Sequence, residues 1–203
     1  MIPTRDMIPT RDMIAALLRK LEQGIHRKGW DEDAMYAELH WEPGNVMRVK
    51  PAPLPDGSPA EYLSWVAQFF TTETLGAAMA TVMAVPTFFG LVLVVEAWTN
   101  EDADVGADGK SLADIVGSYE TREVCAVDIR GNLYGLHRKR GEKPHEWEPG
   151  MFTGRVPQAL LAITLAIAEK LPPGLADLDA LRRPGPIPTS EELAARLAEH
   201  SEA

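Results

Sequence analysis

The segment from Leu75 to Val95 limits the possible folds more than any other feature, because its 21 residues include no charged side chain. A run of this length either spans a bilayer or is buried inside a folded domain. Pro86 interrupts it, and no Lys or Arg between Lys50 and Lys110 could orient a membrane helix. We therefore expect a buried helix followed by a buried strand, in a protein that does not enter a membrane.

Two segments predict the centre of a sheet. Residues 88–98 are β-branched, aromatic and almost continuously apolar, and they are too few for a typical buried helix. We expect them to form the central strand. Residues 122–140 predict an antiparallel hairpin in which Gly131 supplies the positive φ of a short loop. A short strand is expected at 35–41, and the four prolines of 43–57 indicate a loop or an edge segment.

Helices are predicted on either side of these strands, at 12–28, in two pieces between 58 and 85, and at 156–170. Ser58 and Glu61 form a capping box around Pro59, which suits the first position of a helix. This order of elements predicts an α+β fold. We expect an antiparallel sheet of about three to five strands with helices packed on one face.

The domain organisation has three expected parts. Residues 1–6 recur identically at 7–12, so 1–12 is interpreted as a duplicated N-terminal segment. Residues 13–172 are expected to form a single α+β domain, and 173–203 a Pro-rich linker with a C-terminal amphipathic helix. That helix is too short to be stable alone, so we expect it to dock on its own domain or on a second subunit.

The charge and cysteine content exclude several classes of protein. A net charge of −10 removes the general attraction to phosphate that drives nucleic-acid binding. The basic run from His137 to Arg140 is interpreted as a solvated strand end. Cys125 is the only cysteine and lies in an apolar stretch, so we expect it to be buried and unreactive. The absence of disulfides fits a reducing compartment, and we expect the protein to be cytoplasmic.

A search for catalytic and ligand-binding motifs finds none that is complete. Gly109, Lys110 and Ser111 resemble the end of a phosphate loop, but Asp104 stands where that motif needs glycine. The acidic loop at 100–109 lacks the glycine and glutamate of an EF-hand. No two histidines stand four residues apart on a helix. We therefore predict no cofactor, no metal ion and no catalytic residue.

Five residues are nevertheless candidates for a binding site, on the basis of their chemical type and position. They are Glu96, Trp98, His137, Trp41 and Trp147. Glu96 follows five apolar residues, so it lines a pocket, lies in water at the strand's end, or pairs with Arg122 or Arg138 across the sheet. Trp65 and Trp98 are expected in the core. Trp30, Trp41 and Trp147 lie near element ends, where they could rim a pocket or an interface, or cover sheet edges.

The sequence also resembles a known group of proteins over about residues 13–142. The matching features are a leading helix that ends in Gly29-Trp30-Asp31, a valine-rich strand that ends at Glu96, and a basic hairpin from Arg122 to Glu142. They are similar to those of uncharacterised conserved proteins of high-GC Gram-positive (actinobacterial) bacteria or their phages. The resemblance implies a bacterial cytoplasmic protein, and it carries over no catalytic residue.

These observations favour a non-catalytic protein-interaction or regulatory protein. Its expected partner is another protein, or a second copy bound through the C-terminal helix, and neither nucleic acid nor membrane is expected to bind. The alternative is a small-molecule-binding protein or enzyme with a pocket near Glu96 and His137.

Overall fold

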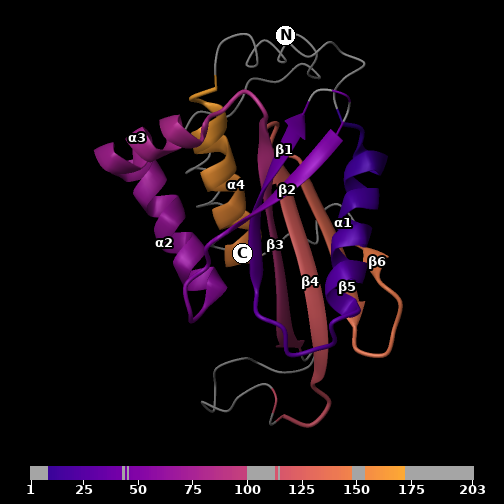
Figure 1. Cartoon of the computed structure of the whole chain (residues 1–203). Helices are drawn as coiled ribbons and strands as arrows, with labels where there is room; N and C mark the ends of the chain where they lie inside the picture. Colours follow the sequence, from indigo (N-terminus) through magenta and orange to yellow (C-terminus); the bar gives the residue numbers. More distant parts are fainter. Residues whose placement is uncertain are drawn as a thin grey trace.

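The computed structural model describes residues 9–42, 44, 46–99, 113, 115–147 and 154–171. The strands found in these residues are β1 (Met35–Glu42), β2 (Val46–Ala52), β3 (Phe88–Thr99), β4 (Tyr119–Asp128), β5 (Leu133–Lys139) and β6 (His145–Glu146). They form one antiparallel sheet in the order β2-β1-β3-β4-β5-β6 (Figure 1). The α+β class is confirmed, but the described sheet has six strands and not three to five, because two short segments extend its edges.

The edge strands are the two that the sequence marks most weakly. β2 contains Pro51, which has no N–H to donate, and an edge strand tolerates such a residue because one side of it is unpaired. The interpretation of 43–57 as an edge segment is therefore confirmed for Val46–Ala52. β6 is only two residues long, too short for any periodicity to be recognised.

β3 lies between β1 and β4, as predicted for the central strand. β4 and β5 form the predicted hairpin, in which Gly131 has a φ of 75°. The buried carboxylate of Asp128 organises the turn by accepting hydrogen bonds from the backbone N–H of Arg130 (2.9 Å) and Asn132 (3.0 Å) and from the Tyr134 hydroxyl (2.9 Å). The Asp128 carboxylate therefore supplies hydrogen-bond acceptors for the backbone N–H groups of this turn.

The described helices are α1 (Arg11–His26), α2 (Pro59–Thr72), α3 (Thr74–Met83) and α4 (Arg155–Ala168). The prediction that they pack on one face is wrong: α1 covers one face of the sheet, and α4 covers the other with α2 packed against it (Figure 1). The reason lies in the strands, because Val124, Cys125, Ala126 and Val127 are all buried although consecutive residues point to opposite faces. A strand that is apolar on both faces needs cover on both.

α1 begins inside the second copy of the N-terminal repeat. The Thr10 hydroxyl caps the helix by accepting a hydrogen bond from the Met13 N–H (3.3 Å). Ile14 and Leu18 are buried against the sheet, and Gly29 follows the helix with a φ of 122°. Residues 1–8 of the repeat, the acidic loop and the predicted C-terminal linker and helix lie outside the described residues.

α3 differs from the buried helix predicted before Pro86. It packs through Gly76 and Ala80, whereas its opposite side is exposed, with Val82 at 78%. Figure 1 shows that it crosses the end of α2 at the edge of the molecule and runs back toward α4, and it contacts both helices. The close turn between α2 and α3 requires Gly76, because a Cβ atom there would lie 1.9 Å from the carbonyl oxygen of Phe69.

Replacing this glycine tests how α3 is held. We expect Gly76→Ala to lower the free energy of unfolding by about 1 to 3 kcal/mol, since the methyl group forces α3 away from α2. Gly24→Ala is the matched control, because nothing lies within 4 Å of its Cβ position in α1. That change should raise stability by about 0.5 to 1 kcal/mol. Urea unfolding followed by circular dichroism measures both, and equal effects would contradict the assigned packing.

Candidate functional site

The first candidate is a group of buried charges between α1 and the sheet, which we call the Arg122 cluster: Glu22, Glu96, Arg122 and Arg138. The Arg122 side chain is fully buried. Its Nε donates to Glu96 Oε1 at 2.8 Å, and its Nη1 donates to Glu22 Oε1 at 3.3 Å. Arg138 donates to both oxygens of Glu22, each at 2.6 Å. Two guanidinium groups therefore face two carboxylates.

The loop after α1 is bound to the same cluster. Arg122 Nη2 donates to the carbonyl oxygen of Gly29 at 2.5 Å. Glu96 Oε2 accepts from the backbone N–H groups of Asp31 (2.6 Å) and Glu32 (3.2 Å). Asp31 has a φ of 72°, uncommon outside glycine, and in this conformation its N–H points at Glu96. Of the alternatives for Glu96, the cross-strand pair with Arg122 is the one observed.

Trp30 lies over this cluster. Its ring is 4.6 Å from the Arg122 guanidinium carbon and 5.5 Å from that of Arg140, which also pairs with Glu120. Cation–π contacts of this kind stabilise a desolvated guanidinium. The charged groups of the cluster thus interact with one another, with backbone groups and with Trp30. These contacts position α1 and leave few groups free to bind an added ligand.

The second candidate lies on the opposite face of the sheet. Val95, Glu123 and His137 are cross-strand neighbours, whereas Glu96, Arg122 and Arg138 form the adjacent row. Because adjacent rows point to opposite faces, Glu96 and His137 do not line the same pocket. His137 instead pairs with Glu123, with 2.5 Å between Nδ1 and Oε1, and its ring centroid lies 4.9 Å from that of His145.

A cavity of about 250 Å³ adjoins Glu123. Its walls come from β3 and β4, from Ala60 of α2, from Trp147 and from the first turn of α4. Among the described residues, no hydrogen-bond partner reaches the buried Oε2 atom of Glu123. Burial raises the pKa of this carboxyl group, and the neighbouring His137 opposes the rise. Sequence reasoning missed Glu123, although its position among buried strand residues was a detectable signal.

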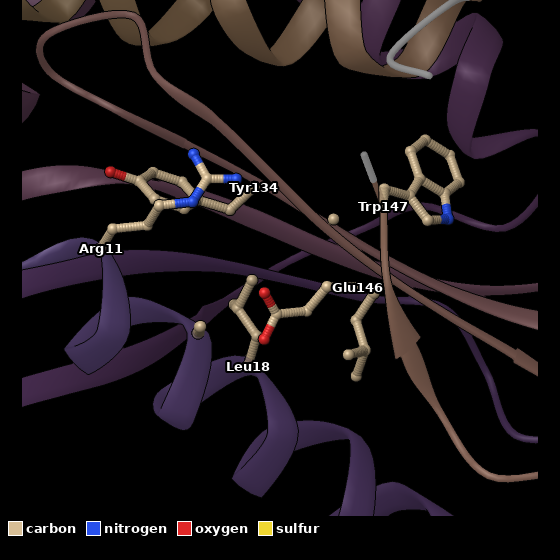
Figure 2. A pocket seen from close by; sticks show the side chains of 8 residues that line it. Arg11, Leu18, Tyr134, Glu146 and Trp147 are labelled. Carbon is tan, nitrogen blue, oxygen red and sulfur yellow. The ribbon is translucent and has the colours of Figure 1, made fainter. Parts of the chain in front are cut away.

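A second hollow lies on the α1 side of the sheet (Figure 2). Its lining includes Arg11, Leu18, Tyr134, Glu146 and Trp147. Its volume is about 10 Å³, which suits a single water molecule. It is therefore too small to hold an organic ligand.

The predicted tryptophans are dispersed. Trp98 (43% exposed) and Trp65 (58% exposed) are not in the core, so that prediction is wrong. Trp98 lies near the end of β3, and Trp65 points outward from α2, where it stacks on Phe69 with ring centroids 5.5 Å apart. Trp41 is half-buried at the end of β1. Trp147 lines the 250 Å³ cavity, and the other four candidate residues do not.

The third candidate is the exposed side of α3, which we call the α3 face: Leu75, Ala78, Met79 and Val82. These residues are exposed and uncharged, and they follow one another at spacings of three and four. They therefore form one stripe along the helix. The sequence did not reveal this stripe because α3 is apolar on all sides.

Neutralising Glu22 tests the Arg122 cluster. We expect Glu22→Gln to lower the free energy of unfolding by about 3 to 5 kcal/mol, because two buried guanidinium groups lose their shared carboxylate. Arg19→Ala is the control on the same helix, α1, and removes a half-exposed ion pair with Glu146. It should lower the free energy of unfolding by about 1 kcal/mol or less. Chemical denaturation compares the two, and similar losses would show that the cluster does not fix α1.

Comparison with protein-family models, with curated proteins and with solved structures finds no match for this chain. Among the described residues, no helix is long and apolar enough to cross a membrane. The same part of the chain contains no group of three or more His, Cys, Asp or Glu side chains placed to hold a metal ion. The α3 face, the Arg122 cluster and the cavity are therefore the features of the described residues that bear on function.

Proposed function

We propose that this chain is a non-catalytic interaction protein that works as a pair of identical subunits joined through the α3 face. The observation that carries the proposal is a helix whose outer side is as apolar as its inner side. Large contiguous apolar areas are rare on monomeric proteins and usually mark an interaction site.

The spacing on α3 specifies what kind of surface would fit it. Leu75, Ala78, Met79 and Val82 occupy positions i, i+3, i+4 and i+7, the pattern by which one helix packs against another. Ala78 is small enough to let a second helix approach closely. On α2, the exposed Trp65 stacks on the half-buried Phe69 and adds a second exposed apolar side chain to the outer side of the molecule. A helical partner is therefore favoured over an extended peptide.

The uncharged α3 face allows a second copy to be that partner. Two chains of net charge −10 repel each other, and repulsion is weakest where a surface carries no charge. α3 itself has no charged residue, so the α3 faces of two copies can meet without bringing like charges together. In a two-fold symmetric dimer the same patch meets itself, which an uncharged apolar stripe can do without mismatch.

The charged groups of the Arg122 cluster already have partners in one another, which supports a non-catalytic role. Association through the predicted C-terminal helix is a separate proposal, and that helix lies outside the described residues.

An acidic substitution on the α3 face tests the pairing. We expect the wild-type chain to have twice the mass of the 22.3 kDa monomer in light scattering coupled to size exclusion. Met79→Asp should weaken association by about a hundredfold or more, because an unpaired charge would be buried in an apolar contact. Met13→Asp on α1 is the matched control, with similar exposure (42% against 45%), and should remain dimeric.

Two outcomes contradict the proposal. One is a wild-type chain that stays monomeric at high concentration. The other is a dimer that survives Met79→Asp but is lost when residues 172–203 are removed, which would assign the association to the C-terminal segment.

A further inference from the structure

We infer that His137 and His145 together form a binding site for a divalent transition-metal ion of the zinc class. The site lies on the opposite face of the sheet from the Arg122 cluster, and it is independent of the proposed pairing through α3. The inference rests on the separation of the two rings, on the hydrogen bond that orients His137, and on the contacts that hold β6.

The sheet brings the two imidazole rings together. His137 of β5 and His145 of β6 are directly opposite each other in antiparallel register, so their side chains leave the same face of the sheet. Their ring centroids are 4.9 Å apart, and the ring planes are inclined by 50°. Two imidazoles that share a tetrahedral ion, with metal–nitrogen bonds of about 2.0 to 2.1 Å, have their centroids about 5 Å apart. The observed separation therefore suits one shared ion without movement of either strand.

Glu123 determines which nitrogen of His137 is available to the ion. His137 Nδ1 lies 2.5 Å from Glu123 Oε1, and an ionised carboxylate only accepts hydrogen bonds. Nδ1 therefore carries the proton, and Nε2 has the lone pair that a metal ion needs. A carboxylate that accepts from a metal-bound histidine in this way fixes the orientation of the ring and raises its basicity. Glu123 is thus a positioning residue, whereas His137 and His145 are the ligands.

β6 is held firmly although it is only two residues long. The Trp147 N–H donates to the carbonyl oxygen of Gly135 at 3.1 Å, and on the other face Glu146 pairs with Arg19 of α1. These contacts fix the strand that carries His145, which is exposed on the last strand of the described sheet. The His137 side chain is 17% exposed. An ion from solution can therefore reach the pair, and water can complete its coordination.

The donor atoms select the kind of ion. Neutral imidazole nitrogen is a ligand that zinc, copper and nickel ions prefer, whereas magnesium and calcium ions prefer oxygen. Copper(II) binds nitrogen ligands more tightly than zinc does. We therefore expect copper(II) to bind more tightly than zinc at this pair, and magnesium not to bind there.

Calorimetric titration of the full chain with zinc chloride tests the site. We expect zinc to bind at submillimolar concentration, and magnesium chloride to give no binding. His145→Ala should weaken zinc binding about tenfold or more, because one of the two protein ligands is lost. His26→Ala removes an exposed histidine at the end of α1. It is the matched control and should bind zinc as wild type does.

NMR of the imidazole nitrogens gives a readout that a purely structural role would not change. Zinc should shift the Nε2 resonance of His137 and leave Nδ1 protonated. Glu123→Gln should weaken zinc binding about tenfold, because the charged acceptor of the Nδ1 proton is lost. The inference is overturned if wild type does not bind zinc at millimolar concentration, if magnesium binds as well as zinc, if His145→Ala binds zinc as wild type does, or if zinc binds Nδ1 of His137 in place of Nε2.

Discussion

The burial of the Arg122 guanidinium is the constraint on which the arrangement of α1 depends. A fully buried charge must find partners, and here Glu22 comes from α1, Glu96 from β3 and a carbonyl oxygen from Gly29. These contacts fix where α1 crosses the sheet and how the chain leaves it. Buried ion pairs often gain little net stability over apolar packing. The main effect that we attribute to this cluster is therefore to specify one arrangement and to disfavour others.

The sequence predicted the elements whose signals are local. Gly131 marks the hairpin turn, and the continuous apolarity of 88–95 marks the central strand. The pairing of Glu96 with Arg122 was one of several alternatives, because cross-strand register cannot be read from one strand. Glu22 was not predicted, yet a signal existed: it continues the buried stripe of Ile14 and Leu18 at intervals of four, so a carboxylate lies on the buried side of α1.

The misplaced elements share one physical cause. Periodicity tells which side of a helix or strand is apolar, but not which surface covers it. The order of elements suggested helices on one face, whereas the doubly buried β4 required two. For the same reason an apolar helix was assigned to the core, although one side of α3 faces outward, as does Trp65. The cavity near Glu123 depends on segments far apart in the chain, so no local pattern could reveal it.

The distance between α3 helices in two copies tests the central claim most directly. Cys125 is buried, and burial raises its pKa to about 12, so a cysteine introduced at exposed Thr81 can be spin-labelled selectively. Packed helices lie about 8 to 10 Å apart, so labels beside the α3 face should show strong dipolar coupling between copies. We predict that this coupling disappears on dilution with unlabelled protein. A spectrum without coupling at concentrations where the chain is dimeric would contradict pairing through α3.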